Sequence, residues 1–227
     1  MSVKVLLVED EANIRQFTKI NLEREGFEIF EAESGEEGLK LAKENKIHVA
    51  VLDVMLPGID GYEVCRQLRQ DYPTIAIIML TAKTQDTDKI NGLEKGADDY
   101  MSKPFNPREL VLRIKAVLRR TDVEEDSQTI DDETFKLDLY SRSFSKNGKE
   151  ITLTPTEYNI VKLLMENPGK AISRNELMDK AWGENFVGDA KIVDVNIRRL
   201  RSKIEDDSNN PKYILTVWGV GYKWHKE

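Results

Sequence analysis

The 227-residue sequence contains little cysteine and histidine, and it has no long apolar run. Its one cysteine, Cys65, cannot form an internal disulfide, and we interpret it as a small buried apolar residue. No apolar run approaches the ~20 residues that span a bilayer. The apolar start of the chain is interrupted by acidic residues too soon for a signal peptide. We therefore expect a cytoplasmic protein with no membrane partner.

Two motifs that belong to enzymes are also missing. Neither GxGxxG nor GxxxxGK[ST] follows an apolar run, which argues against a nucleotide-binding site. Phosphatases with an aspartate nucleophile carry a second aspartate two residues after the first, whereas Asp53 is followed by Val54 and Met55. We therefore expect a protein that is not an enzyme.

Basic residues are fewer than acidic ones, 34 against 41, and the net charge is −7. For the whole chain this balance argues against a nucleic-acid partner. The charge is uneven, however, because residues 134–227 hold 16 Lys and Arg against 13 Asp and Glu, a net charge of +3. The length suits two ordinary domains, and we place them at residues 1–121 and 129–227, with an acidic linker at 122–128.

From residue 3 to about residue 120, short apolar runs alternate with stretches of helical periodicity. The expected strands are VKVLLV, FEIFEA, VAVLD, AIIML and DDYMSK, and the expected helices begin at Asn13, Glu36, Tyr62, Gln85 and Pro107. Strict alternation of five strands and five helices indicates an α/β fold, with a parallel sheet covered on both faces. In such a fold the functional crevice lies beyond the carboxyl ends of the strands.

Polar side chains stand at those carboxyl ends. Glu9 and Asp10 follow the first strand, Asp53 ends the third, Thr81 ends the fourth, and Lys103 ends the fifth. Carboxylates gathered at one edge repel one another unless a hard divalent cation such as Mg²⁺ binds them. Lys103 and Thr81 add a positive charge and a hydroxyl donor for a tetrahedral anion. The combination suits phosphoryl transfer onto the carboxylate of Asp53.

Each of these residues also has an ordinary structural interpretation. Glu9 and Asp10 alone would be an acidic pair at a helix N-terminus. Lys103 alone would belong to a strand-end turn, and Tyr100 alone would be a core residue. None of these interpretations explains why the polar groups meet at one sheet edge.

Residues 1–121 resemble the receiver domain of two-component systems, through VLLVEDE, VLDVMLPGIDGYE, MLTAK and GADDYMSKPF in the family's order. The resemblance implies a flavodoxin-like (βα)5 fold with strand order 2-1-3-4-5. It implies that Asp53 accepts a phosphoryl group from a sensor histidine kinase, with Mg²⁺ as cofactor. The residues implied are the metal ligands Glu9, Asp10, Asp53 and the backbone carbonyl of Met55, the catalytic pair Thr81 and Lys103, and the switch residues Thr81 and Tyr100.

Charged residues near the end of this domain resemble the dimer interface of the OmpR/PhoB subfamily. Scattered surface charge is the alternative interpretation. In a two-fold interface each ion pair occurs twice and fixes register more than affinity. The resemblance implies a homodimer on phosphorylation, closed by Lys89 with Glu109, Asp99 with Arg113, and Glu94 with Lys115.

Beyond residue 120 the pattern changes to strand-like pieces, three helical stretches and a final hairpin, which indicates a small α+β module. Asn147-Gly148 predicts a hairpin turn, and Thr154 and Ser173 are the expected helix caps. The stretch 189–207 carries an apolar stripe on one face and basic residues on the others. Such a helix suits a DNA major groove, although a solvated amphipathic helix is the simpler interpretation in isolation.

Residues 129–226 resemble the winged helix-turn-helix effector domain of the OmpR/PhoB family, through TPTEY, ISRNEL, VDVNIRRLRSKI and TVWGVGYKW. The resemblance implies that the third helix enters the major groove and that the wing at 213–224 follows the minor groove. The loop at 183–190 is implied to contact RNA polymerase. The residues implied to contact DNA are Val195 and Arg199 at bases, Lys191, Asn196, Arg198 and Arg201 nearer to phosphates, and Tyr222 and Lys223 in the wing.

Some positions depart from the family pattern. Lys191 and Lys223 stand where arginine is common, and lysine lacks the bidentate fork of arginine. Trp218 stands where a basic residue is common, and we interpret it as a packing residue rather than a contact. The resulting hypothesis is a phosphorylation-dependent, DNA-binding transcriptional regulator. The alternative is a constitutive DNA-binding protein whose receiver does not switch.

Overall fold

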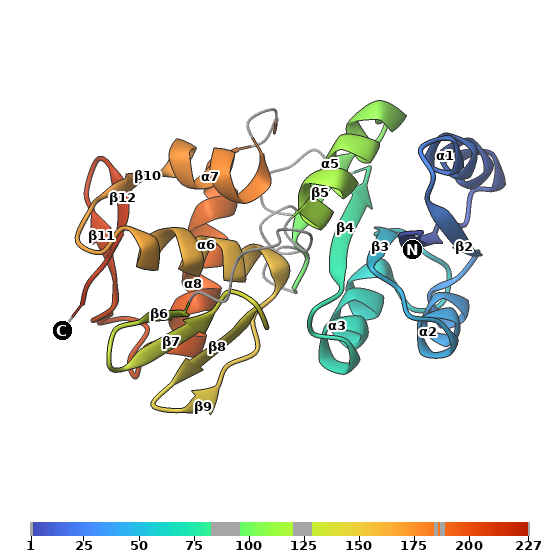
Figure 1. Ribbon diagram of the computed structural model, residues 1–227. Coiled ribbons are helices and arrows are strands. Elements are labelled where there is room, and N and C mark those ends of the chain that lie inside the picture. Colours follow the sequence, from blue (N-terminus) through green and yellow to red (C-terminus); the bar gives the residue numbers. More distant parts are fainter. Residues whose placement is uncertain (1, 83–95, 120–128, 184–185, 187–188, 227) are drawn as a thin grey trace. The chain divides into compact units, whose positions relative to one another are not determined.

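The computed structural model describes residues 2–82, 96–119, 129–183, 186 and 189–226 (Figure 1). The chain divides into two compact units, Met1–Arg119 and Arg120–Glu227. None of the described helices is long and apolar enough to cross a membrane.

The first unit is a parallel α/β sheet. Its five strands lie in the order β2-β1-β3-β4-β5, and every neighbouring pair is parallel. The predicted fold class and strand order are therefore confirmed, while the helix expected from Gln85 lies outside the described residues. The elements are β1 (Lys4–Val8), α1 (Ala12–Arg24), β2 (Glu28–Ala32), α2 (Gly35–Glu44), β3 (Val49–Asp53), α3 (Gly61–Asp71), β4 (Ala76–Thr81), β5 (Asp99–Ser102) and α5 (Pro107–Arg119).

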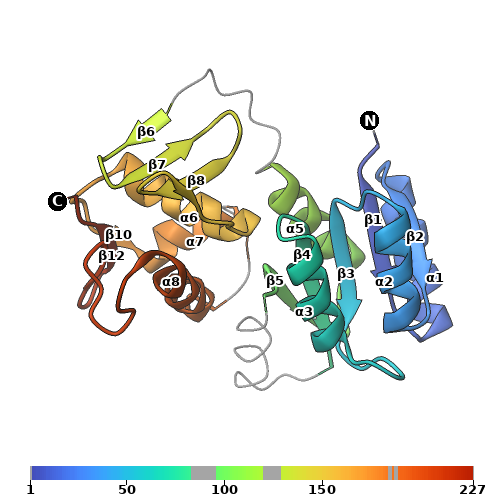
Figure 2. The same ribbon diagram turned by 90° about the horizontal axis from the view of Figure 1, so that it is seen from below.

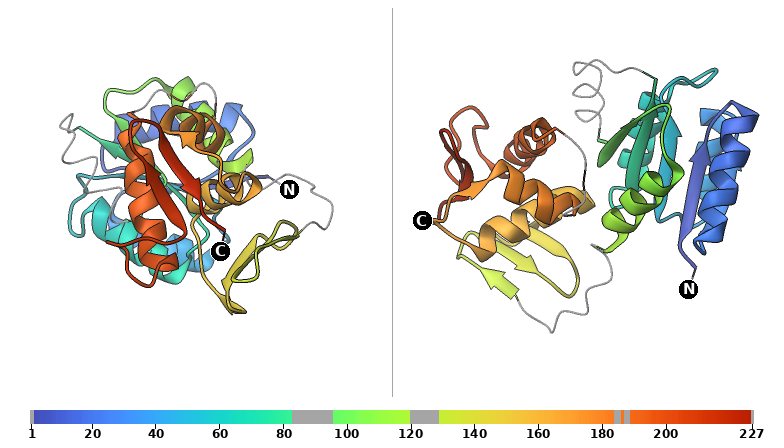
Figure 3. Two further views of the ribbon diagram at one scale, coloured as in Figure 1. Left: turned by 90° about the vertical axis from the view of Figure 1, so that its left-hand side faces the viewer. Right: turned by 90° about the horizontal axis from the view of Figure 1, so that it is seen from above.

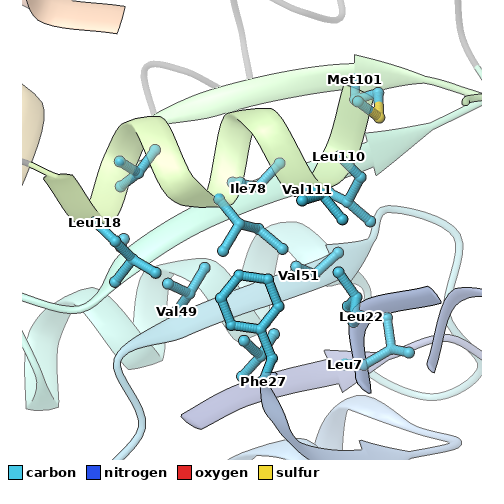
Figure 4. Close-up of a cluster of buried hydrophobic side chains, with 14 of the residues drawn as sticks. Leu7, Leu22, Phe27, Val49, Val51, Ile78, Met101, Leu110, Val111 and Leu118 are labelled. Atoms are coloured by element: carbon cyan, nitrogen blue, oxygen red, sulfur yellow. The ribbon is translucent and has the colours of Figure 1, made fainter. Parts of the chain in front are cut away.

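Helices cover both faces of this sheet, with α1 and α5 on one side and α2 and α3 on the other (Figure 2). Every residue of β3 and β4 is buried, as expected for strands covered on both faces. Under α1 and α5 lies a contiguous apolar core in which Phe27, Val51 and Ile78 pack against Leu110 and neighbouring residues of α5 (Figure 4). This burial fixes the strands, and with them the positions of the residues that follow the strands.

Local capping explains where two of these helices begin. The Ser34 side chain accepts a hydrogen bond from the backbone N–H of Glu37, and the Asp60 carboxylate accepts one from the N–H of Glu63. A capping side chain occupies the last non-helical position. Helices α2 and α3 therefore begin at Gly35 and Gly61, one residue before the predicted starts at Glu36 and Tyr62.

The second unit is an α+β module with two antiparallel sheets. One has the order β6-β7-β8-β9, and the other has the order β10-β12-β11. This is the predicted arrangement of an N-terminal sheet, three helices and a hairpin wing. The elements are β6 (Thr129–Asp131), β7 (Phe135–Asp138), β8 (Ser143–Lys146), β9 (Lys149–Glu150), α6 (Pro155–Glu166), β10 (Ile172–Ser173), α7 (Arg174–Trp182), α8 (Lys191–Ile204), β11 (Ile214–Val217) and β12 (Gly221–Trp224).

Three local predictions hold in this unit. Asn147 and Gly148 connect β8 to β9, Thr154 forms a capping box with Glu157, and the Ser173 side chain caps α7. The short strand β10 was not predicted, because two residues are too few to form a periodic pattern. It pairs with β12 and so joins the wing to the start of α7.

Candidate phosphoacceptor site and nucleic-acid interface

The sheet register brings the predicted polar groups to one edge. Asp53 pairs with Leu80 and Thr81 pairs with Ser102, so strands β3, β4 and β5 end side by side. Glu9 and Asp10 directly follow β1, which pairs with β3. Asp53 is only 3% exposed, although it ends its strand. The five predicted groups therefore share one rim.

Lys103 connects two of the carboxylates. Its Nζ lies 2.5 Å from Asp53 Oδ2, and it lies 2.9 Å from Glu9 Oε1 and 2.7 Å from Oε2. Burial alone would lower the pKa of Lys103, but its hydrogen bonds to Asp53 and Glu9 outweigh burial and raise that pKa. Lys103 therefore stays positively charged between two acidic groups.

One carboxylate oxygen from each of Glu9, Asp10 and Asp53 lies within 4.8 Å of the other two. Three carboxylates facing one lysine leave a net negative cluster, and hard oxygen donors are what Mg²⁺ prefers. Burial raises the pKa of Glu9 to about 7, a hydrogen bond from Lys103 opposes this rise, and the charge of Asp53 adds to it. The donor set therefore fits a divalent cation, which would offset the surplus negative charge.

A backbone N–H holds the Asp53 side chain, and the backbone of α3 packs closely against that of β3. The N–H of Met55 donates to Asp53 Oδ1 over 3.1 Å. A Cβ atom at Gly61 would lie 1.9 Å from the backbone oxygen of Asp53, so only glycine permits this close approach of α3 to β3. The sequence pattern identified Asp53 but not the requirement for Gly61.

The two predicted switch residues are both buried. Thr81 ends β4, and its backbone oxygen accepts a hydrogen bond from the N–H of Lys103 over 2.7 Å. Tyr100 lies on β5, paired with Met79 of β4. These positions place Thr81 at the site and Tyr100 one strand away, within the same sheet.

The expected dimer residues make contacts within the chain. Arg113 Nη1 lies 2.7 Å from Asp99 Oδ2, and Arg113 Nη2 lies 2.6 Å from Glu109 Oε1. Lys115 Nζ lies 2.5 Å from Glu25 Oε2, at the end of α1. Lys89 and Glu94 lie outside the described residues.

Helix α8 is the expected recognition helix, and its buried face includes Val193, Ile197 and Leu200. Lys191 and Arg198 are exposed, and Arg199 is partly exposed. The structure differs from expectation at Asn196, which has no accessible surface and donates from Nδ2 to the backbone oxygen of Ile192 over 2.9 Å. In this conformation Asn196 cannot reach a phosphate. Val195 is also buried.

A carboxylate from α6 holds two basic residues of α8. Glu157 is fully buried, and its Oε1 lies 3.1 Å from Arg199 Nη2, while its Oε2 lies 2.6 Å from Lys203 Nζ. The sequence pattern assigned Glu157 to the capping box of α6 alone. The second contact could not be predicted, because it joins residues more than forty positions apart.

The wing is joined to the same helix. Tyr222 Oη donates to Asp194 Oδ1 over 2.7 Å, and Arg174 Nε also donates to Asp194 Oδ1, over 2.7 Å. Arg201 donates from Nη2 to the backbone oxygen of Ile214 over 2.6 Å. Tyr222 and Arg201, both expected at DNA, therefore make contacts between α8 and the wing, and the Tyr222 ring is buried.

Trp218 is 91% exposed, so it is not the packing residue that the sequence predicted. Trp218 instead lies in the turn between β11 and β12, where the short connection leaves its side chain in solvent.

Comparison with known proteins finds a family match in each half of the chain. Residues 5–115 match the response regulator receiver domain, and residues 148–224 match the family described as transcriptional regulatory protein, C terminal. The chain is 43% identical to the alkaline phosphatase synthesis transcriptional regulatory protein PhoP of Bacillus subtilis (strain 168), over 98% of this chain and 97% of PhoP. It is 44% identical to the transcriptional regulatory protein AfsQ1 of Streptomyces coelicolor, over 96% of each.

A solved structure of the response regulator DrrB, an OmpR/PhoB homologue from Thermotoga maritima, is 38% identical over 99% of this chain and all of DrrB, with a TM-score of 0.54. A RitR mutant, at 27% identity and full coverage of both chains, has a TM-score of 0.79. The relatives are regulators of transcription, in agreement with the expectation that this protein is not an enzyme. The chain belongs to the OmpR/PhoB family of two-component response regulators, with a receiver domain and a DNA-binding domain.

Proposed function

We propose that Asp53 accepts a phosphoryl group from a phosphohistidine of a sensor histidine kinase and that this modification increases binding to promoter DNA. In the transfer, the P–N bond of the donor breaks as a P–O bond to Asp53 forms. The observation that carries the proposal is the direct contact of Lys103 with Asp53, over 2.5 Å, beside two further carboxylates. Positioning and charge neutralisation are most of what phosphoryl transfer requires.

Each group of the site has a distinct task in this proposal. Lys103 leaves its carboxylate partners to neutralise the incoming phosphoryl oxygens, and the Thr81 hydroxyl donates a hydrogen bond to one of them. The N–H of Met55 orients the Asp53 carboxylate. Glu9, Asp10, Asp53 and the carbonyl of Met55 would hold Mg²⁺, which supplies charge neutralisation between the carboxylates and the phosphoryl group.

The signal would pass from Asp53 to the surface of β5 and α5 through Thr81 and Tyr100. Movement of Thr81 toward the phosphoryl group leaves space that the Tyr100 ring occupies, and this reshapes the surface of β5 and α5. Two receivers then pair through that surface. A paired receiver holds two DNA-binding domains together, so binding to tandem half-sites strengthens through effective concentration.

Dimerisation requires an exchange of ion-pair partners. Arg113 now contacts Asp99 of its own chain over 2.7 Å, and in the proposed dimer it would contact Asp99 of the second copy. Arg113→Glu should abolish dimerisation of the phosphorylated protein, measured by sedimentation. The double variant Asp99→Arg, Arg113→Glu should restore it. Dimerisation of Arg113→Glu at the wild-type affinity would contradict this interface.

In the second unit, α8 would enter the major groove of promoter DNA. Lys191 and Arg198 are exposed on α8 and are the residues best placed for phosphates. Arg199 would contact bases, and Lys223 would contact DNA from the wing. RNA polymerase would contact the loop at 183–190, where residues 184–185 and 187–188 lie outside the described residues. The domains would be residues 1–121 and 129–227, joined by the linker 122–128.

The acceptor assignment is tested with a small phosphodonor, acetyl phosphate, and Mg²⁺. Wild-type protein should gain one phosphoryl group, which mass spectrometry places on Asp53, and Asp53→Asn should gain none. Asp60→Asn is the matched control, because Asn caps a helix as well as Asp and α3 keeps its start. Wild-type incorporation in Asp53→Asn would overturn the assignment.

A further inference from the structure

Arg15, in the first turn of α1, holds the segment that carries two carboxylates of the phosphoacceptor rim. Its Nη1 donates to the backbone oxygen of Glu9 over 2.6 Å and to that of Asp10 over 3.2 Å. The Arg15 side chain is only 12% exposed, although it starts from a surface helix. The right panel of Figure 3 shows α1, in blue, against the strands β1 and β2. One guanidinium group therefore fixes the two backbone carbonyls that follow β1.

The turn between β1 and α1 depends on this contact, because the helix is not capped in the usual way. Glu11 occupies the N-cap position of α1, and its side chain accepts no hydrogen bond from the N–H groups of the first turn, whereas the residues before α2 and α3 do cap their helices. The N–H of Glu9 donates to the backbone oxygen of Ala32 in β2 over 3.1 Å. Glu9 is therefore held by β2 at its N–H and by Arg15 at its carbonyl.

Arg15 is itself oriented by the loop that follows β2. Its Nη2 donates to Glu33 Oε1 over 2.9 Å, and the backbone N–H of Glu33 donates to Glu37 Oε2 in the first turn of α2 over 2.8 Å. The Glu33 side chain is 73% exposed, so its ion pair with Arg15 contributes little stability by itself. The contact directs the guanidinium group, and the bonds to the two carbonyls fix the turn.

Arg15 and Lys103 are two cations with different relations to the same acidic cluster. Lys103 contacts the carboxylate of Glu9, whereas Arg15 contacts the backbone of Glu9 and Asp10. Any positive charge near the cluster opposes the binding of another cation. A group that holds metal ligands in their binding geometry has the opposite effect, because those ligands lose less conformational freedom on binding. The two effects of Arg15 on Mg²⁺ affinity therefore differ in sign.

We propose that Arg15 is a positioning residue for the Mg²⁺ site, which holds the β1–α1 turn so that the carboxylates of Glu9 and Asp10 stay close to Asp53. This inference rests on the proposed Mg²⁺ binding by that cluster. Arg15 acts through the backbone of the turn and needs no contact with the cation. Its charge opposes Mg²⁺ binding, but its hydrogen bonds to the two carbonyls favour binding more strongly.

The first test is the Mg²⁺ affinity of the full chain, measured by calorimetry. Arg15→Gln should bind Mg²⁺ about tenfold more weakly than wild type, at the lower end of the loss that follows removal of a group that orients metal ligands. Loss of a positive charge alone would tighten binding, so the direction of the change separates positioning from charge. Tighter or unchanged binding by Arg15→Gln would overturn the inference.

Lys19→Gln is the matched control. Lys19 lies one turn after Arg15 on α1, and its Nζ contacts Glu31 of β2 over 2.6 Å. The substitution removes the same charge from the same helix but leaves the bonds of Arg15 to Glu9 and Asp10 in place. Lys19→Gln should bind Mg²⁺ at least as tightly as wild type. A loss of affinity equal to that of Arg15→Gln would assign the effect to a weakened α1 and contradict the inference.

The conservative variant Arg15→Lys tests the geometry at constant charge. Lysine keeps the charge but lacks the planar fork of the guanidinium group. Arg15→Lys should bind Mg²⁺ more tightly than Arg15→Gln and more weakly than wild type. Weaker binding by Arg15→Lys than by Arg15→Gln would show that charge governs the affinity, and it would overturn the inference.

The Mg²⁺ dependence of Asp53 labelling by acetyl phosphate separates positioning from loss of structure. Arg15→Gln should need about tenfold more Mg²⁺ for half its maximal rate, and its rate at saturating Mg²⁺ should approach that of wild type. A rate that stays low at saturating Mg²⁺ would contradict positioning. Absence of Mg²⁺ binding by wild type would overturn the proposed metal site and this inference together, whereas equal affinities of wild type and Arg15→Gln would overturn this inference alone.

Discussion

Arg199 of α8 lies 3.1 Å from the carboxylate of Glu157, a fully buried residue of another helix. The same carboxylate accepts a hydrogen bond from the backbone N–H of Thr154 and contacts Lys203. One buried acid therefore both caps α6 and holds the side of α8 that carries Arg199. The orientation of α8 depends on a residue that need not touch DNA.

Replacement of Glu157 should destabilise the second unit, and the loss of stability should depend on how many of its contacts the new residue removes. Glu157→Gln keeps the capping geometry but removes the charge that faces Arg199 and Lys203, and it should cost about 2 kcal/mol. Glu157→Ala should cost about 1 kcal/mol more, because the cap is lost as well. Urea unfolding followed by tryptophan fluorescence measures this unit alone, since all three tryptophans lie beyond residue 180. Equal stability of both variants and wild type would contradict the role of Glu157.

Removal of Lys103 should affect Mg²⁺ binding and phosphoryl transfer in opposite directions. Lys103 neutralises Asp53 and Glu9, so Lys103→Ala leaves the carboxylates more negative and should bind Mg²⁺ more tightly. Phosphorylation of Asp53 should slow at least about tenfold, since the group that neutralises the phosphoryl oxygens is gone. Calorimetric Mg²⁺ titration and the rate of labelling by acetyl phosphate measure the two effects. A slower rate with weaker Mg²⁺ binding would indicate that the site had merely lost its structure.

Mg²⁺ affinity should depend on pH near neutrality. Burial raises the pKa of Glu9 to about 7, so Glu9 is largely protonated below that pH and ionised above it. Mg²⁺ must displace the proton, and its affinity should therefore fall as the pH decreases from 8 to 6. Calorimetry in two buffers of different ionisation enthalpy should detect proton release at pH 6 and little at pH 8. Glu9→Gln should remove this dependence, and its persistence in that variant would assign the proton to another group.

Much of the fold could be predicted from the sequence because the signals are local. The strands are apolar runs. The caps at Thr154 and Ser173 each bond to a residue three positions later, so they mark the start of a helix locally. The gathering of Glu9, Asp53 and Lys103 followed from parallel topology, since strand ends share an edge. These inferences needed no knowledge of side-chain packing.

The remaining features depend on tertiary contacts. Asn196 lies on the helix that carries the exposed basic residues, yet its amide is buried against the backbone of α8. Tyr222 was expected at DNA, but its hydroxyl donates to Asp194. Trp218 was expected to pack, but the turn leaves it in solvent. Tyr222 contacts a residue 28 positions away, Trp218 follows the geometry of its turn, and the amide of Asn196 turns back to its own helix, and no periodic pattern records these outcomes.

The most direct test of phosphorylation-dependent DNA binding is a gel-shift titration of promoter DNA, selected from genomic fragments, with and without acetyl phosphate. Wild type and Asp60→Asn should bind more tightly with the phosphodonor, and Asp53→Asn should bind equally with and without it. Identical wild-type curves in both conditions would contradict a switch and favour constitutive DNA binding.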